Sequence, residues 1–380
     1  MSIKYENCRE SIILENGAVF RNRIFFAAMG IDCAQDDGSF SQSLYEFYAG
    51  IIRGGVGAVV FANASISKSS RLKLGGLLLT TAAHANALQP IIDYANDQRC
   101  VAIIQLQHYG AQGLTELTGS PLLAPTVSMA ARNGSAPMKA MSHSDINGVV
   151  DQFANAAIRA ETIGAGGIQI QASNGYLISS FLSPFSNLRN DEYGGDIIGR
   201  ARFLLEIVKA IRSCLSRQTM VSVRLNVDDV VDFGGVSLED VIETVHMLKM
   251  SGCDLVELSC CVRQSFKSLI TPSHSFIDMV RSKVRAVRAS SSLPISYAGG
   301  TRSLLEAESL LTSATCDLVG MSRALFADND LVRKSLANRE HDISACLFEG
   351  NCFRDKSNPL ADRVYCCVSK IYPRPSHIKY

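Results

Sequence analysis

The sequence predicts an α/β protein, most simply a (β/α)8 TIM barrel with a C-terminal extension. Short β-branched apolar runs alternate with amphipathic helical stretches along the 380 residues, and strands that are separated by helices pair in parallel. No GxGxxG follows the first predicted strand, which disfavours the alternative, an open doubly wound sheet. No shift in composition marks a linker, so we expect residues 1–340 to form one barrel and residues 341–380 to pack on it as an extension.

The first three units are predicted before residue 142. Gly54 and Gly55 end the first helix, and a long loop rich in Gly, Ser and Pro follows the third strand, from His108 to Met141. The next helix is predicted to begin near Ser142, because Ser142 and Asp145 resemble a capping box. The predicted strands are Arg23–Met29, Ala58–Ala62 and Val101–Leu106, and the first two helices are Ser43–Arg53 and His84–Gln98.

The fourth unit, Gly166–Arg212, is the most informative stretch of the chain. Ile168 and Ile170 are β-branched and bounded by glycines, which favours a buried strand over a helix. Apolar residues then recur at helical spacing up to Ile211, which predicts the following helix. Between the two lies a polar cluster at the carboxyl end of the strand, made of Gln171, Ser173, Asn174 and Tyr176.

The last four units follow the same pattern. Their predicted strands are Val221–Leu225, Leu255–Leu258, Ile295–Ala298 and Leu318–Met321, and their helices are Leu238–Met250, one that ends near Ala289, and Ser303–Leu311. In a (β/α)8 barrel the active site lies at the carboxyl ends of the strands, so its candidate residues can be named in advance. They are Met29, Gly30, Ala62, Asn63, Gln105, His108, Gln171, Asn174, Arg224, Glu257, Ser259, Gly299, Gly300, Ser322 and Arg323.

These strand-end residues disfavour two kinds of chemistry. No lysine ends a strand, which argues against a Schiff-base aldolase, whose amine must stand beside the substrate carbonyl. There is neither an HxH pair nor a cluster of carboxylates, so no metal centre is expected. The remaining groups are mostly neutral amides. The exception is Arg224, which in an apolar strand would be an unpaired buried charge without an anionic partner, and this argues for a role in binding a ligand.

The same residues suit a flat heteroaromatic cofactor that carries a phosphate. Amides can donate and accept hydrogen bonds along a ring edge, and an arginine can offset negative charge on the ring. Gly299, Gly300, Ser322 and Arg323 follow the seventh and eighth strands, where barrels commonly hold a phosphate against backbone N–H groups. The residues therefore predict a phosphorylated flavin as cofactor.

Composition favours a small-molecule ligand over a macromolecular one. The chain carries 37 basic and 36 acidic residues without a run of like charges, so we expect neither nucleic acid nor a membrane surface as partner. Twelve cysteines scattered through buried or helical stretches are typical of a reducing compartment. The first 17 residues mix charges into every turn, so no signal peptide or membrane span is expected. We expect a cytoplasmic protein, and a homo-oligomer is possible.

Several motifs along residues 5–340 carry a family resemblance. The stretch NGYLISSFLSPFSNLRNDEYGGDIIGRARF in the fourth unit is the most specific of them. Four other places agree in order and spacing, namely RNRIFFAAM, QLQHYG, VSVRL, and the pair AGGTRSLLEAESLL and DLVGMSRALFADNDL. On these motifs the chain resembles the old yellow enzyme family of FMN-dependent ene-reductases.

The resemblance implies a mechanism and assigns roles to residues. NADH or NADPH reduces FMN, and hydride passes from the flavin to the β-carbon of an α,β-unsaturated carbonyl compound, while a tyrosine, here Tyr176, protonates the α-carbon. Gln105 and Arg224 are expected to contact the flavin ring, with Arg224 offsetting the negative charge of the reduced ring. Gly300, Ser322 and Arg323 are expected to hold the phosphate. The remaining expected cofactor contacts are Ala27, Ala28, Met29, Gly30, Ala62 and Gly299.

The chain also departs from the family pattern around the substrate. The family usually holds the substrate carbonyl with HxxH or HxxN, whereas this sequence has Gln171 and Asn174, and an amide cannot become cationic. Gly30 stands where a Cys or Thr is common, Ala28 where a proline is usual, and Ser322 where a glycine is usual. An alternative function is therefore a flavin-binding barrel with lost or altered reductase activity, which acts as a binding or regulatory module.

Two further groups of residues receive structural interpretations. Larger relatives, similar to dienoyl-CoA reductases, carry cysteines for a [4Fe–4S] centre after the barrel, but here Glu349 replaces one ligand and the spacing differs by one residue. Ordinary thiols are therefore expected for Cys346, Cys352 and Cys366. His108 and Tyr109 are expected to pack within their loop.

Overall fold

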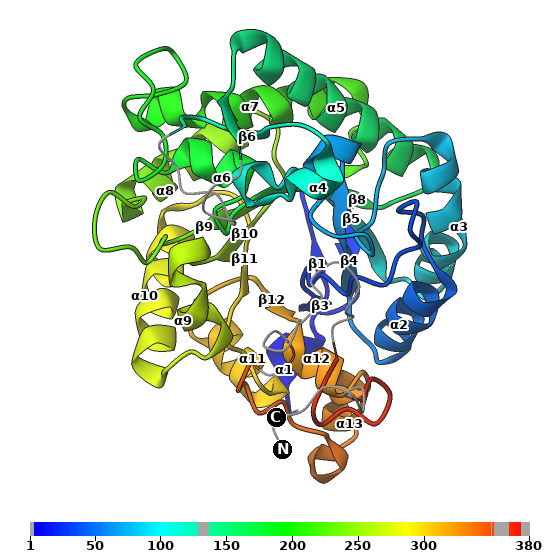
Figure 1. Cartoon of the computed structure of the whole chain (residues 1–380). Helices are drawn as coiled ribbons and strands as arrows, with labels where there is room; N and C mark the ends of the chain where they lie inside the picture. The colour runs from blue at the N-terminus through cyan, green and yellow to red at the C-terminus, as the bar shows by residue number, and fades with distance from the viewer. Residues whose placement is uncertain (1–3, 128–136, 351, 353–364, 374–380) are drawn as a thin grey trace.

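A closed barrel of eight parallel strands forms the centre of the molecule (Figure 1). The computed structural model describes residues 4–127, 137–350, 352 and 365–373. Each barrel strand pairs with the next one along the chain, and the last closes on the first through the register Val319↔Ile24. The strands are β3 (Ile24–Phe26), β4 (Ala58–Ser65), β5 (Val101–Gln107), β8 (Gly167–Ala172), β9 (Met220–Asn226), β10 (Leu255–Ser259), β11 (Ile295–Ala298) and β12 (Leu318–Met321). The predicted (β/α)8 barrel is confirmed.

A ring of helices surrounds the barrel, and the seven longer helices between its strands all begin in the same way (Figure 1). In each, the side-chain oxygen of a Ser, Thr or Asp accepts a hydrogen bond from the backbone N–H three residues later, which satisfies a donor that the helix leaves unpaired. These N-caps are Ser41, Thr81, Ser142, Asp196, Ser237, Ser273 and Ser303. The helices are α2 (Gln42–Arg53), α3 (Ala82–Asp97), α5 (His143–Thr162), α7 (Ile197–Cys214), α8 (Leu238–Met250), α10 (His274–Ser290) and α11 (Leu304–Thr312). After β12 come α12 (Arg323–Ala327) and α13 (Leu331–Leu336).

The structure differs from the predicted elements after β3 and after β5. The first barrel strand ends at Phe26, whereas the apolar run had predicted a strand to Met29, because pairing with β4 stops at Phe26↔Val59. The loop from His108 to Met141 contains a short parallel pair, β6 (Leu122–Ala124) with β7 (Met138–Ala140), and the turn of helix α4 (Thr115–Thr118). Residues 128–136 of this loop lie outside the described part of the chain.

An antiparallel hairpin covers the amino end of the barrel. It consists of β1 (Ile12–Ile13) and β2 (Val19–Phe20), and it belongs to an apolar cluster with the lower barrel interior. The buried members of that cluster are Leu14, Phe20, Phe25, Ala27, Ala58, Val60, Ile103, Met220, Leu255, Ala298 and Leu318. Burial of this apolar surface stabilises the barrel from below.

Above the apolar cluster the barrel interior becomes polar. Strand register places Gln105 beside Gln169, Gln171 beside Arg224, and Arg224 beside Glu257. All of these side chains are buried. Polar groups at this depth need partners inside the barrel or in a bound ligand, so this layer marks the functional end of the molecule.

Short helices lie in the loops at the carboxyl ends of the strands. They are α6 (Leu177–Leu182) after β8 and α9 (Phe266–Ile270) after β10, whereas α1 (Glu6–Arg9) lies near the start of the chain. From the predicted extension, Tyr372 stacks on Phe326 with ring centroids 5.3 Å apart, and its hydroxyl accepts a hydrogen bond from Asn329. Residues 353–364 and 374–380 of the extension are outside the described residues.

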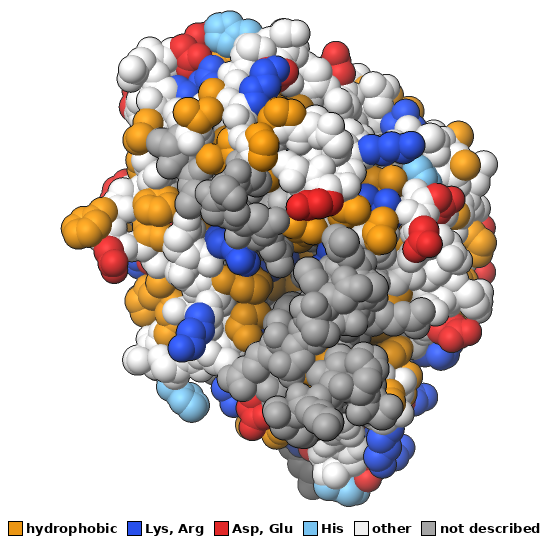
Figure 2. Space-filling view, in the orientation of Figure 1, with side chains coloured by type: hydrophobic (Ala, Val, Ile, Leu, Met, Phe, Trp, Pro, Cys, Tyr) orange, Lys and Arg blue, Asp and Glu red, His pale blue; other side chains and the backbone are white. Residues whose placement is uncertain are grey.

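The surface carries mixed charge. On the described part of the face in Figure 2, acidic and basic side chains are interspersed. None of the described helices combines the length and the apolar character that crossing a membrane requires.

Candidate active site

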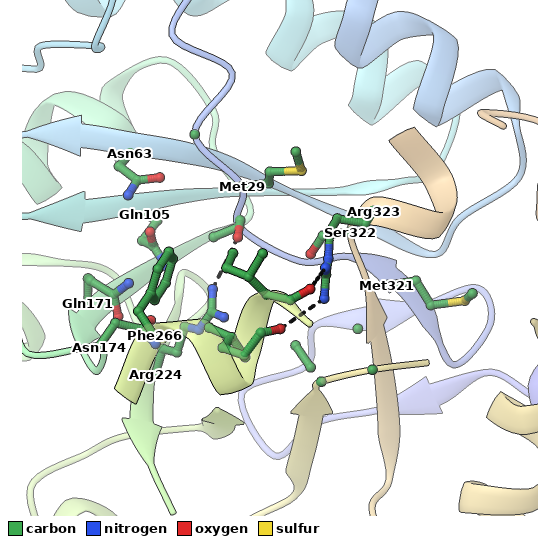
Figure 3. A pocket seen from close by; sticks show the side chains of 18 of the residues that line it. Met29, Asn63, Gln105, Gln171, Asn174, Arg224, Phe266, Met321, Ser322 and Arg323 are labelled. Atoms are coloured by element: carbon green, nitrogen blue, oxygen red, sulfur yellow. Dashed lines mark hydrogen bonds between the residues drawn. The ribbon is translucent and has the colours of Figure 1, made fainter. Parts of the chain in front are cut away.

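One cavity at the carboxyl ends of the strands collects nearly all of the predicted site residues (Figure 3). The loops after β3, β8, β10, β11 and β12 contribute to its wall, and so do residues within strands β4, β5, β8, β9, β11 and β12. The predicted residues in this wall are Ala28, Met29, Gly30, Asn63, Gln105, Gln171, Asn174, Tyr176, Arg224, Gly299, Gly300, Ser322 and Arg323. Residues that came from seven separate segments of the sequence thus meet at one place.

Ala27 and Ala62 do not reach the cavity wall. Ala27 is fully buried, and its carbonyl accepts a hydrogen bond from Ser322 Oγ at 3.1 Å. The Ala62 N–H donates to the hydroxyl of Tyr48 at 3.0 Å. The next residue, Asn63, lines the cavity instead. The structure therefore supports no direct contact of Ala27 or Ala62 with a ligand in this cavity.

The turn after β8 holds Gln171 and Asn174 differently. The side-chain oxygen of Gln171 accepts from Ser173 Oγ at 2.7 Å and from the Ser173 N–H, so the Gln171 NH2 group remains as a donor toward the cavity. Asn174, at φ 61°, donates from Nδ2 to the carbonyl of Cys260 at 2.9 Å. Its amide therefore links two loops, and Gln171 offers the more available donor.

Tyr176 is the N-cap residue of α6 and stands at the junction of two cavities. It lines the inner cavity and also an outer one that is bordered by Lys73, Tyr109 and Arg263. The Tyr109 ring meets Tyr176 edge to face, with centroids 4.9 Å apart. Tyr109 thus forms part of the site wall, whereas the sequence had suggested packing within its loop.

His108 is buried behind this wall. Its Nδ1 accepts a hydrogen bond from the Gly110 N–H at 3.0 Å, while its buried Nε2 has no partner within the described part of the chain. Burial lowers the pKa of His108 to about 3, so the imidazole is neutral under physiological conditions. A neutral histidine that does not line the cavity cannot replace the cationic group that Gln171 fails to provide.

Arg224 has an anionic partner, which corrects the inference from sequence. Its Nε lies 3.1 Å from Glu257 Oε1, an ion pair without hydrogen-bond alignment, and the carboxylate is fully buried. The guanidinium also donates to the carbonyl of Ala28 and to Ser259 Oγ, each at 3.2 Å. Sequence reasoning missed this pair because Glu257 and Arg224 lie on different strands, although both were among the strand-end residues. Arg224 still faces the cavity.

Small residues form the cavity floor on the β11 and β12 side. A Cβ at Gly299 would stand 2.5 Å from the Tyr297 hydroxyl, and one at Gly320 would stand 2.7 Å from the Phe25 ring. Two buried polar atoms at the cavity, Gln105 Oε1 and Thr301 Oγ1, have no partner among the described residues. A floor built of small residues, next to these two unpartnered polar atoms, fits a flat cofactor ring that can form hydrogen bonds, such as a flavin.

Arg323 stands at the opposite end of the cavity from Gln105. Its guanidinium donates to the carbonyls of Leu269, at 3.1 Å, and Ile270 at the end of α9 (Figure 3). The Phe348 ring lies 4.3 Å from the guanidinium carbon. Among the described residues the hydrogen bonds of Arg323 go to neutral carbonyls, and a cation in this position suits a phosphate, which would replace these carbonyls as the acceptor. Sequence reasoning gave no signal for α9, whose Phe266 and Ile270 also line the cavity.

The C-terminal cysteines lie close to the Arg323 end of the cavity. A small cavity beside Arg323 is lined by Cys346, Cys352, Cys366 and Cys367. Burial raises the pKa of Cys346 and Cys366, and raises that of Cys352 to about 12, so these thiols are protonated at neutral pH. Within the described ranges, the group of potential metal ligands with close ligand atoms is instead His143, Asp191 and Glu192 on the surface.

A closed (β/α)8 barrel with a polar cavity at its carboxyl ends is the arrangement of a cofactor-binding barrel enzyme. Residues 12–342 match the NADH:flavin oxidoreductase / NADH oxidase family, and the chain belongs to this family. The match confirms the resemblance to old yellow enzymes, the expected enzyme class, and FMN with NADH or NADPH as cofactors.

Relatives of known activity are similar over most of this chain. An NADH oxidase of Thermoanaerobacter brockii is 28% identical over 360 residues, which cover 91% of this chain and 55% of that protein. An NADPH dehydrogenase of Geobacillus sp. is 28% identical over 310 residues, which cover 81% of this chain and 88% of that protein. The chain thus spans about half the length of the first of these relatives.

Solved structures agree with the fold. A 2-naphthoyl-CoA reductase in complex with 2-naphthoyl-CoA superposes with a TM-score of 0.83 at 26% identity, over 90% of this chain and 54% of that chain. An old yellow enzyme homologue from Zymomonas mobilis superposes with a TM-score of 0.74 at 22% identity, over 87% and 93% of the two chains. The second comparison shows the shared barrel fold.

Proposed function

We propose that this protein reduces the activated C=C bond of an α,β-unsaturated carbonyl compound or a similar acceptor, with NADH or NADPH as reductant. The observation that carries the proposal is the meeting of Tyr176, Gln171, Gln105 and Arg224 in one cavity. Bound FMN would supply the redox chemistry, by taking hydride from the nicotinamide and passing it to the acceptor. A cytoplasmic location and a homo-oligomer stay predictions.

The protein side chains would orient the acceptor and supply its proton. The NH2 group of Gln171 is oriented toward the cavity because Ser173 occupies its oxygen, so it can donate to an acceptor carbonyl. Tyr176 stands at the mouth of the inner cavity and would deliver its hydroxyl proton to the α-carbon. Arg323 and the glycines after β11 would hold the phosphate of the cofactor.

A second candidate is a flavin-binding barrel with lost or altered reductase activity. The observation that favours it is that the turn after β8 offers only weak polarisation of a substrate carbonyl. Gln171 cannot become cationic, and the Asn174 amide already donates to Cys260. FMN binding depends on other residues and would survive this loss.

One anaerobic titration separates the two candidates. The purified protein is loaded with FMN, then NADPH or NADH is added without oxygen and the flavin absorbance is followed. For the reductase we expect bleaching, followed by recovery of colour when cyclohexenone or a quinone is added. A yellow protein that neither nicotinamide bleaches would support the binding module, and failure to take up FMN would refute both.

A further inference from the structure

A buried hydrogen-bond relay joins the two residues that are expected to contact the flavin ring. Glu257 lies on β10 below the cavity and does not line it. Its Oε2 accepts from Gln169 Nε2 at 3.0 Å, and Gln169 Oε1 accepts from Gln105 Nε2 at 2.7 Å. The other oxygen of Glu257 faces Arg224 at 3.1 Å. All four side chains are at least nine-tenths buried, so water does not compete for these bonds.

The charge of Glu257 gives this relay a direction. A carboxylate can only accept hydrogen bonds, so Gln169 must turn its NH2 group toward Glu257 and its oxygen toward Gln105. Gln105 must then donate from Nε2 to Gln169, which leaves Gln105 Oε1 as the atom for the cavity. That oxygen is buried and has no partner among the described residues. It can therefore accept a hydrogen bond from a ligand N–H, and the oxidised isoalloxazine ring has such a group at N3.

Glu257 acts on Arg224 as well. The guanidinium is fixed by donation to Ala28 and Ser259, and the carboxylate beside it offsets part of its positive charge. Arg224 faces the cavity, so its effective charge influences how readily a bound ring accepts negative charge.

We propose that Glu257 is a positioning residue for the flavin. It turns Gln105 into a hydrogen-bond acceptor for the N3–H through Gln169, and it moderates the charge of Arg224. The proposal rests on the FMN binding of the proposed function and not on the identity of the acceptor.

The test compares FMN with FMN methylated at N3, which lacks the N–H. Dissociation constants are measured for both flavins by quenching of flavin fluorescence on the apoprotein. The native protein should prefer FMN about tenfold, because the methylated flavin leaves Gln105 Oε1 buried and unpaired. Glu257→Gln and Gln169→Leu should each reduce this preference to about twofold, since both release the orientation of Gln105.

A double substitution provides the sharpest control. Glu257→Gln combined with Gln169→Glu moves the carboxylate next to Gln105, which must again donate from Nε2, so the preference for FMN should return. Ser222 lies on the same strand as Arg224, and its buried hydroxyl donates to the Ile168 carbonyl. Ser222→Ala removes this hydroxyl and should leave the preference for FMN over methylated FMN unchanged. The midpoint potential of bound FMN should rise in Glu257→Gln and stay nearly constant in Gln169→Leu.

An unchanged preference in Gln169→Leu overturns the relay, even if Glu257→Gln fails to fold. An unchanged midpoint potential in a folded Glu257→Gln overturns the effect on Arg224. A native protein that binds FMN without ever being reduced contradicts the proposed reductase but leaves this test valid. A native protein that binds no flavin overturns both.

Discussion

The amide side chains in the cavity each use one hydrogen-bonding group on a neighbouring residue, and this determines which group is left for a ligand. Ser173 occupies the oxygen of Gln171, Cys260 occupies the amide of Asn174, and Gln169 occupies the amide nitrogen of Gln105. Of these three amides, the NH2 group of Gln171 remains as a donor for a ligand and the side-chain oxygen of Gln105 remains as an acceptor. Specific recognition at the residue scale therefore depends on neighbours that do not touch the ligand.

Replacing Tyr176 by Phe tests the proton donor. The substitution keeps the ring that packs against Tyr109 and removes the hydroxyl. We expect kcat for cyclohexenone to fall about 10²-fold or more, because the α-carbon needs a proton, whereas a quinone should be reduced at a nearly unchanged rate. Steady-state kinetics with both acceptors measure the difference. Equal losses for the two acceptors would remove Tyr176 from the protonation step.

Replacing Gln171 by Leu tests the carbonyl donor. Loss of this NH2 group should lower kcat for cyclohexenone about 10²-fold, because one hydrogen bond to the developing negative charge disappears. Ser173→Ala is the matched control. It only loosens the Gln171 amide, so we expect a loss of about tenfold or less. If both variants reduce the enone like the native protein, the carbonyl is bound elsewhere.

The sequence predicted which residues gather at the site but not how they are paired. Gln105, Gln171 and Arg323 could be placed because strand ends of a parallel barrel meet at one face. The Arg224–Glu257 pair could not be predicted, since their side chains meet only once β9 and β10 are in register. The capping of α9 by Arg323 depends equally on tertiary packing.

At the scale of elements, the start of a helix could be predicted from neighbouring residues, whereas the pairing of strands could not. The start of α5 at Ser142 was readable because a capping box is completed within four residues. The end of β3 was not, since a strand continues only while a neighbour supplies backbone partners. The parallel pair β6–β7 was missed for the same reason.

The capping box of α5 makes stability depend on pH in a predictable direction. Asp145 pairs with Lys139 and accepts from the Ser142 hydroxyl and the Ser142 N–H, and these contacts lower its pKa to about 2. The stabilisation is complete above the unfolded pKa of Asp, about 4, and is lost as the pH falls through about 2. Asp145→Asn should therefore cost about 1 kcal/mol at pH 7 and almost nothing near pH 2.

Urea denaturation of both proteins between pH 2 and pH 7 measures this difference. Asp151→Asn, on the exposed side of the same helix, is the control and should show no such trend. A difference in the free energy of unfolding that stays constant with pH would mean that the charge of Asp145 does not support the cap.

In the whole molecule, the apolar residues that stabilise the fold and the polar residues of the site lie toward opposite ends of the barrel axis. At the amino end, the hairpin β1–β2 and the lower barrel form a purely apolar cluster. At the carboxyl end, the interior carries Gln105, Gln169, Arg224 and Glu257, buried groups that are costly unless paired. Apolar burial at one end thus offsets the cost of the polar layer that the other end needs to bind its cofactor.

Phe20→Ala and Gln105→Leu should separate these two ends. Phe20 is 1% exposed within the amino-end cluster, so its truncation should lower the free energy of unfolding by about 3 kcal/mol or more, measured by urea denaturation. Phe20 does not line the cavity, so the dissociation constant of FMN should stay nearly the same. Gln105→Leu should weaken FMN binding, because it removes a ligand contact inside the cavity. If Phe20→Ala weakens FMN binding as much as Gln105→Leu does, the two ends are coupled, and the amino-end cluster then helps to set the geometry of the polar layer.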